Sequence, residues 1–197
     1  MKRRDAFKKT ALVAGSAIAT PSLFSLLQSC QEQSRLDWQP KFLAEEQVRL
    51  VSAMVDTILP KTETSGGLDV KVDVFVDLVI SELYDKEGQI SITQEMSAFD
   101  ESCKNDFGKS FDQLTTNQRA EVLTIAESKS GKFNGSVWGT AVGVQAPVGF
   151  YRNMKSMILW GYFSSEEIGK NLLNYDPIPG EYRGCIPLAD IGNTWSL

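Results

Sequence analysis

Residues 50–84, LVSAMVDTILPKTETSGGLDVKVDVFVDLVISELY, decide the fold class of this chain. Up to Pro60 the apolar residues recur at the spacing that places side chains on one face of an α-helix. They are Leu43, Val48, Val51, Val55 and Ile58. Pro60 ends this predicted helix, and turn-forming residues fill 61–69. Helical spacing resumes over 70–84, at Val72, Phe75, Val76, Val79 and Leu83. The stretch therefore predicts two helices joined by a loop.

The second of these helices carries three regularly spaced acids. The many β-branched residues of 70–84 would also suit a strand, but Asp69, Asp73 and Asp77 lie four residues apart and favour a helix with one acidic face. A calcium loop needs the pattern D-x-D-x-D-G, which is missing here. We therefore expect the three carboxylates to lie on a solvated face.

The middle of the chain predicts two further helices. One apolar stripe runs through 91–107, at Ile92, Met96, Phe99, Cys103 and Phe107. Thr115 and Gln118 match a capping box and open the next helix. Its predicted core residues are Val122, Leu123 and Ala126.

Glycines then recur every fourth residue, at Gly131, Gly135, Gly139 and Gly143. On a helix they would form a smooth packing stripe, but each glycine there costs about 1 kcal/mol, so a loop is favoured. Pro147 suits the first turn of a last long helix, with one side formed by Phe150, Tyr151, Met154, Met157 and Ile158. We predict no β-hairpin, and the fold class is mainly α, a small irregular helical bundle.

The N-terminus has the pattern of an export signal. Residues 1–9 are basic and residues 10–29 carry no charge. Arg3 and Arg4 resemble the pair of a twin-arginine signal, and the residues up to Cys30 resemble a bacterial lipobox, in which this cysteine is acylated. We expect residues 1–29 to be the signal, 30–42 a tether and 43–197 the domain. The alternatives are a cleaved soluble protein and an uncleaved membrane helix over 10–29.

Composition excludes several kinds of chemistry. The chain has 197 residues and no histidine, which excludes catalytic triads built on histidine and imidazole-based zinc sites. Its three cysteines form no CxxC pair, and no dinucleotide or phosphate-loop fingerprint occurs. Loss of residues 1–29 would remove five of 20 basic and one of 25 acidic residues and change the net charge from −5 to −9. Such a charge argues against nucleic acid and against anionic headgroups, so a lipid on Cys30 would have to be the tether.

The segment 160–188 predicts a long C-terminal loop rich in aromatic residues, proline and glycine. Such a loop packs either on its own helices or in a protein interface, where tryptophan, tyrosine and arginine are favoured. The candidate partner-interface residues are Trp160, Tyr162, Phe163, Asn174, Tyr175, Asp176, Pro177, Pro179, Gly180, Tyr182 and Cys185.

GYFSSEEIG followed by LNYDPIPGEYRGC resembles the C-terminal signature of the gluconate 2-dehydrogenase subunit 3 family. LVSAMVDTILPKTET and DVKVDVFVDLVISEL resemble the N-terminal half of this family, and FGKSFDQLTTNQRAEVL resembles its middle. The resemblance covers residues 43–188, and a twin-arginine-like leader is also a feature of the family.

The resemblance implies a small accessory subunit without a cofactor of its own. Its large partner would be a periplasmic, FAD-binding sugar or sugar-acid dehydrogenase of the glucose-methanol-choline type, which performs the hydride chemistry. A cytochrome c subunit completes many such complexes. The small subunit would stabilise the flavoprotein and help to export it, and lipid on Cys30 would hold the complex at the periplasmic side of a bacterial membrane.

Two other functions are open at this point. A hydrolase could use paired carboxylates, for which the tail offers Glu166, Glu167, Asp176 and Glu181. A membrane-anchored binding lipoprotein would have no flavoprotein partner. For the cysteines, we expect Cys103 to be a buried small apolar residue and Cys185 to lie near the partner surface, either free or bonded to Cys103 or to the partner.

Overall fold

The computed structural model describes residues 38–133, 136–137, 140–141, 146–176, 178, 180 and 185–196. Contacts divide the chain into residues 1–39 and 40–197, and the second unit carries the elements below. The predicted signal with Arg3 and Arg4, the lipidation residue Cys30 and most of the predicted tether lie outside the described residues.

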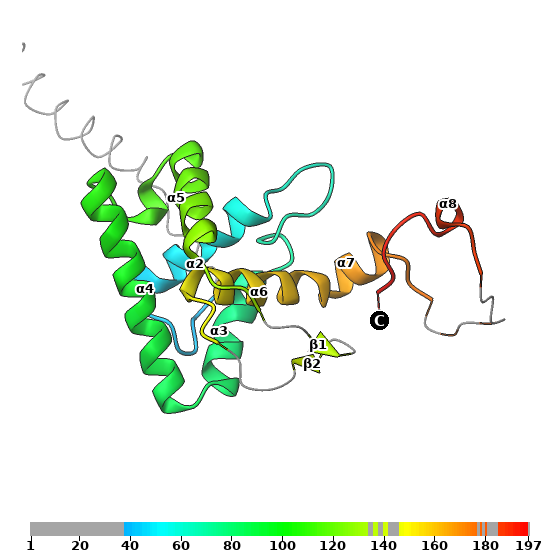
Figure 1. Ribbon diagram of the computed structural model, residues 1–197, viewed down its shortest axis with the longest axis horizontal. Coiled ribbons are helices and arrows are strands. Elements are labelled where there is room, and N and C mark those ends of the chain that lie inside the picture. The colour runs from blue at the N-terminus through cyan, green and yellow to red at the C-terminus, as the bar shows by residue number, and fades with distance from the viewer. Residues whose placement is uncertain are drawn as a thin grey trace, which may run out of the picture. The chain divides into compact units, whose positions relative to one another are not determined.

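The unit 40–197 is mainly α-helical, as predicted (Figure 1). Its helices are α2 (Glu45–Ile58), α3 (Val72–Leu83), α4 (Lys86–Phe107), the 3₁₀ turn η1 (Phe111–Gln113), α5 (Thr116–Lys129), α6 (Phe150–Phe163), α7 (Glu166–Asn171) and α8 (Leu188–Ile191). The prediction of no β-hairpin is wrong at one place, because β1 (Ser136–Val137) pairs antiparallel with β2 (Thr140–Ala141). Two residues separate these strands, which is the commonest length of a hairpin loop.

Helix α2 lies at the centre of the packing. It contacts α3, α4, α5 and η1, and its buried residues are Val48, Leu50, Val51, Ala53, Met54 and Val55. Met54 and Val55 have no exposed surface. The helical spacing read from the sequence therefore identified Val48, Val51 and Val55 of this core face and missed the other three, because the buried face is wider than the predicted stripe.

Capping groups fix where the helices begin. Thr115 and Gln118 form the predicted capping box at the start of α5. Helix α4 begins five residues before the predicted stripe, because the Asp85 carboxylate accepts a hydrogen bond from the Gly88 N–H at 2.8 Å. Helix α6 begins after Pro147 rather than around it, since Gly149 at its N-cap has a φ of 85°, outside the helical region.

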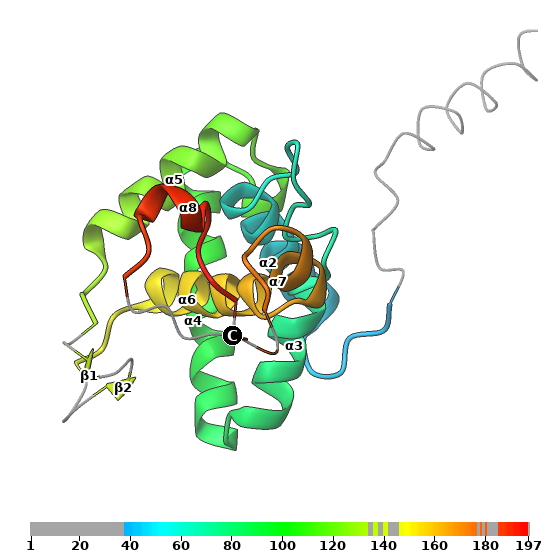
Figure 2. The same ribbon diagram turned by 90° about the vertical axis from the view of Figure 1, so that its right-hand side faces the viewer.

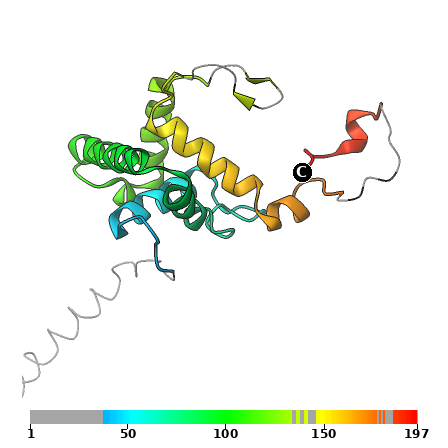
Figure 3. The ribbon, with the colours of Figure 1, turned by 90° about the horizontal axis from the view of Figure 1, so that it is seen from below.

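Helix α6 packs against α3, and both are seen side by side in Figures 2 and 3. Their close approach requires glycine at position 161, where a Cβ atom would lie 2.5 Å from the Phe75 ring. Trp160, Tyr162 and Phe163 belong to the last turns of this helix, so the predicted irregular segment begins later than expected. The helix continues through them because the prolines of the tail come only after residue 176.

The expectation of a solvated acidic face is wrong for Asp77 and Asp73, although Asp69, which precedes α3, is exposed as expected. Asp77 is fully buried, and its carboxylate accepts hydrogen bonds from the backbone N–H groups of Lys41, Phe42 and Leu43 at 2.6, 3.1 and 2.7 Å. Asp73 accepts a hydrogen bond from the Ser52 hydroxyl at 2.9 Å. These carboxylates therefore join α3 to the segment before α2 and to α2 itself.

A charged cluster joins α5 to α6. The Glu127 carboxylate lies 2.6 Å from Arg152 Nη2 and 3.1 Å from Lys155 Nζ. The hydrogen bond from Lys155 lowers the pKa of Glu127, with Arg152 adding to the effect. This cluster contributes stability only while Glu127 is ionised.

We predict that the Glu127→Gln variant has a lower free energy of unfolding than wild type at neutral pH, and that this difference becomes smaller in acid. Because the pKa of Glu127 is lower in the folded chain, its contribution is complete above the ordinary value of 4.5 and is lost as the pH falls through the folded-state value. Urea unfolding of wild type and variant across this range measures the difference. The exposed Glu121, replaced by glutamine on the same helix, is the control. If the difference in free energy of unfolding between wild type and Glu127→Gln stayed the same in acid, the stabilising role of ionised Glu127 would be contradicted.

Candidate partner interface

Two aromatic side chains lie exposed at the end of α6. The exposed fraction is 52% for Trp160 and 51% for Phe163. The Trp160 ring stands edge-on to Phe75 with the centroids 5.0 Å apart, and the Phe163 ring meets Tyr162 in the same way at 5.4 Å. These contacts hold the rings in defined positions on the surface, which suits them to packing against another protein.

Tyr162 is an interface candidate that the structure places in the core of its own chain. Its exposed fraction is 6%, and its hydroxyl donates a hydrogen bond to the Ser65 carbonyl at 2.8 Å. Helical geometry thus turns Tyr162 toward the core, while Trp160 and Phe163 lie on the exposed side of α6. Its role is to tie α6 to the loop after α2.

The tail loop, residues 172–196, follows α7 (Figure 3). Its described part exposes large apolar side chains, which are Tyr175, Ile178, Ile186, Leu188 and Trp195. Leu188 and Ile178 are 85% and 84% exposed, more than any other large apolar side chain in the part of the chain that the structure describes. Five large apolar side chains exposed within one segment make it a candidate interaction surface.

Hydrogen bonds close the base of the tail loop. Asn174 forms an isolated parallel bridge with Trp195, in which the Asn174 N–H donates to the Thr194 carbonyl and the Ser196 N–H donates to the Asn174 carbonyl, each at 2.9 Å. The Asn174 side-chain amide donates to the carbonyls of Ile191 and Asn193. We name these contacts, together with those that Ser196 and Asn193 make to α7 and the turn after it, the clasp.

The clasp also reaches α7 and the turn after it. The Ser196 hydroxyl donates to the Gly169 carbonyl at 2.9 Å. The Asn193 side-chain amide donates to the Leu172 carbonyl at 2.7 Å. Both ends of the tail loop are therefore fixed to the same helix end.

The other candidate residues divide into exposed ones and ones outside the described residues. Tyr175, Asp176, Gly180 and Cys185 are exposed. Lys170 Nζ lies over the Tyr175 ring, 6.0 Å from its centroid, in a cation–π arrangement. Pro177, Pro179 and Tyr182 lie outside the described residues. The sequence interpretation missed Ile178, Ile186, Leu188 and Trp195, because apolar residues of an irregular segment have no periodicity that would reveal their exposure.

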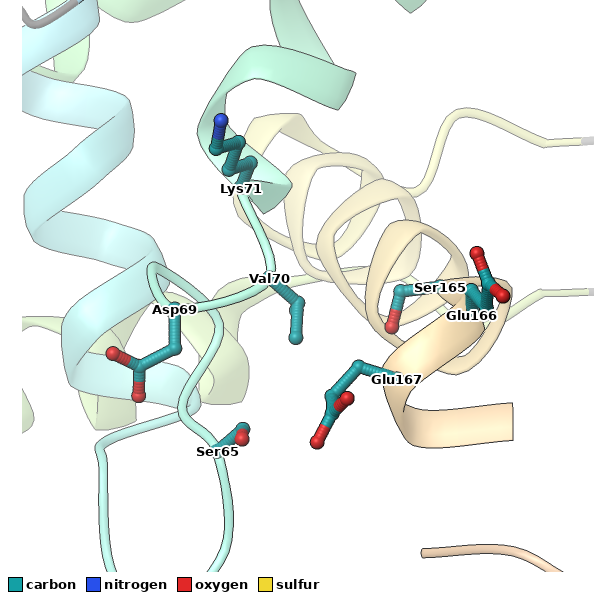
Figure 4. Close-up of a pocket in the computed structure, with 7 residues that line it drawn as sticks. All are labelled: Ser65, Asp69, Val70, Lys71, Ser165, Glu166 and Glu167. Atoms are coloured by element: carbon teal, nitrogen blue, oxygen red, sulfur yellow. The ribbon is translucent and has the colours of Figure 1, made fainter. Parts of the chain in front are cut away.

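The carboxylates of α7 border an open depression (Figure 4). Val70, Ser165 and Glu167 point toward it, and Lys71 and Glu166 point away. Glu166 forms an ion pair with Lys170 at 2.6 Å, and this hydrogen bond lowers the pKa of Glu166. A general acid in a carboxylate pair needs a raised pKa. The ion pair with Lys170 therefore does not suit Glu166 to be the general acid that the hydrolase alternative requires.

Within the described residues, no group of three or more histidine, cysteine, aspartate or glutamate side chains is placed to hold a metal ion. Among the same residues, no helix has both the length and the apolar character to cross a membrane. The predicted alternative of a membrane helix over 10–29 lies outside them.

The two described cysteines differ in environment, and both are free thiols. Cys103 is buried on α4, as predicted, and burial, with Asp100 nearby, raises the pKa of its thiol to about 11. Cys185 is exposed in the tail loop.

We predict that iodoacetamide labels Cys185 in the native protein and Cys103 only after unfolding, because the thiolate is the reactive form and Cys103 is both protonated and inaccessible. Peptide mapping by mass spectrometry measures the label at each position. Rapid native labelling of Cys103, at the rate seen for Cys185, would contradict the burial.

Comparison with protein families gives a match over most of the unit. The family model described as gluconate 2-dehydrogenase subunit 3 matches residues 45–180. The matched range runs from the start of α2 into the tail loop and includes Trp160, Phe163 and Asn174. The comparisons with curated proteins and with solved structures gave no match.

Proposed function

Because the chain belongs to the gluconate 2-dehydrogenase subunit 3 family, we propose that it is a non-catalytic accessory subunit of a periplasmic, FAD-dependent dehydrogenase of the glucose-methanol-choline type. The flavoprotein partner oxidises a CH–OH group of a sugar or sugar acid and determines the substrate. A cytochrome c subunit is the further candidate member of the complex. FAD belongs to the partner in this proposal.

The observation that carries the proposal is the exposed apolar surface at the end of α6 and in the tail loop. Trp160 and Phe163 are about half exposed, while Ile178 and Leu188 are almost fully exposed. Burial of such side chains against a partner is favourable by about 25 cal/mol per Å² of apolar area. A subunit that works in a complex accounts for this exposure better than a solitary chain does.

The proposed role in export rests on the N-terminal sequence. A twin-arginine signal with Arg3 and Arg4 suits cargo that folds in the cytoplasm around its cofactor, and the proposed partner holds FAD. The accessory subunit would stabilise the flavoprotein and carry it across the membrane. After export, lipid on Cys30 would keep the complex at the periplasmic side of the membrane, where the acidic chain itself has little affinity for anionic headgroups.

Fractionation of cells tests the proposal. We expect the Arg3→Lys/Arg4→Lys variant to leave the FAD-dependent dehydrogenase in the cytoplasm, and deletion of the whole chain to lower its amount. The Lys8→Arg variant, which keeps the charge beside the pair, is the matched control. The Cys30→Ser variant should move the exported complex from the membrane to the soluble periplasmic fraction. Unchanged amount and location of the dehydrogenase in the deletion strain would contradict the accessory role and favour a binding lipoprotein.

A further inference from the structure

Polar contacts fix both ends of the tail loop, although large exposed side chains in its described part are apolar. Ile178 and Leu188 project into solvent, and Trp195 is 52% exposed. The base of the loop is held by the clasp, whose side-chain hydrogen bonds come from Asn174, Asn193 and Ser196. Fixing the two ends of the loop removes part of the conformational entropy that would otherwise be lost when a partner covers it.

Asn174 is the central residue of the clasp. Its backbone groups pair with Thr194 and Ser196, and its side-chain amide donates to two carbonyls, of Ile191 and Asn193, that lie 17 and 19 residues further along the chain. One side chain therefore closes a loop of about twenty residues. Alanine at this position would remove two donors without altering the helices α2 to α6, because the clasp touches only α7, α8 and the tail itself.

We propose that exposed apolar side chains of the tail loop, Ile178, Ile186, Leu188 and Trp195, enter an apolar recess of the partner subunit, and that the clasp of Asn174, Asn193 and Ser196 fixes the two ends of the loop before the partner arrives. This inference rests on the proposed function. The loop and its apolar side chains make the contact, and Asn174 is a positioning residue.

The charge of the tail favours a protein over a lipid surface. Asp176, Glu181 and Asp190 outnumber the one basic residue, Arg183. Anionic headgroups attract clusters of lysine and arginine. A loop that is apolar and slightly acidic fits a recess that is apolar and bordered by basic groups.

Immunoprecipitation of the native complex from detergent-solubilised membranes tests the inference, with flavin per molecule of this chain as the readout. We expect Asn174→Ala to lower the retained flavin about tenfold, since it removes two hydrogen bonds that preorganise the loop. The matched control is Asn171→Ala, which removes an amide donor to Glu167 at 2.9 Å on exposed α7. In the control the retained flavin should equal that of wild type.

A second pair of variants separates the apolar contact from the clasp. Ile178→Ser/Leu188→Ser should lose the flavoprotein, while hydrogen exchange shows the Ser196 N–H still protected and the thermal midpoint of the helices unchanged. The control is Leu83→Ser/Ile90→Ser, which changes side chains 67% and 59% exposed on α3 and α4 and should retain the flavoprotein.

The outcomes distinguish the inference from the proposed function. If wild type retains no flavoprotein, the proposed function fails. If wild type and both tail variants retain it equally, the function stands and the role of the tail loop is overturned. If the tail variants keep the flavoprotein but lose binding to phosphatidylglycerol vesicles, the loop contacts lipid and the inference is likewise overturned.

Discussion

Replacing Asp77 with asparagine should lower the free energy of unfolding by about 3 kcal/mol. The carboxylate is fully buried and accepts three backbone N–H groups, from residues 41, 42 and 43. Asparagine keeps the shape but offers one acceptor oxygen, and its amide hydrogens face donors. At least one of these buried N–H groups would be left without a hydrogen-bond partner, which alone lowers the free energy of unfolding by about 1 to 3 kcal/mol.

Asp73→Asn is the matched control for this prediction. Asp73 lies one turn earlier on α3 and is half-buried, and its side-chain partner is the Ser52 hydroxyl. We expect its replacement to cost about 1 kcal/mol or less. Urea unfolding at neutral pH measures both variants. Equal losses for Asp77→Asn and Asp73→Asn would show that Asp77 does not hold the segment before α2.

Replacing Phe111 with alanine should lower the free energy of unfolding by about 3 to 5 kcal/mol. Phe111 has no exposed surface, and its ring lies 5.4 Å from that of Phe99 on α4. The turn η1 that carries it packs against α2 and α4. Its N–H donates to Asp100 Oδ1 at 2.8 Å, so the residue is held by its backbone as well and the cavity left by the ring would close only in part.

Phe163→Ala is the control for Phe111→Ala. It removes the same atoms from a side chain that is 51% exposed, and we expect a loss below about 1 kcal/mol. The same variant should weaken retention of the proposed partner, since Phe163 lies in the candidate interface. Thermal or urea unfolding compares the two variants, and a loss at Phe111 as small as that at Phe163 would contradict the core position of η1.

The helices were predictable because most of their buried positions follow the local spacing of apolar residues, although Leu83, predicted on the apolar face of α3, is 67% exposed. Val51 and Val55 on α2, and Met154 and Ile158 on α6, are buried as their periodicity indicates. Asp77 was not predictable, because the N–H groups that it accepts lie 34 to 36 residues earlier in the chain. Local spacing alone placed it with Asp69 and Asp73 on a solvated face.

The candidate interface was predictable only in part, for the same reason. Aromatic content pointed to Trp160 and Phe163, which are exposed, but also to Tyr162, which helical geometry turns inward. The two ends of the tail loop are joined by pairs such as Asn174 with Thr194 and Asn193 with Leu172, which lie about twenty residues apart. No short sequence pattern signals such pairs, so the exposure of Ile178 and Leu188 became visible only with the structure.

We propose that this chain works as a subunit of a flavoprotein complex. The most direct test is to immunoprecipitate the native protein from solubilised membranes and to determine the mass, the subunit ratio and the visible absorption spectrum of the product. We predict a larger flavoprotein in equimolar ratio with this chain, with the absorbance of bound flavin and with dehydrogenase activity on a sugar or sugar acid. A colourless product that contains this chain alone would contradict the claim.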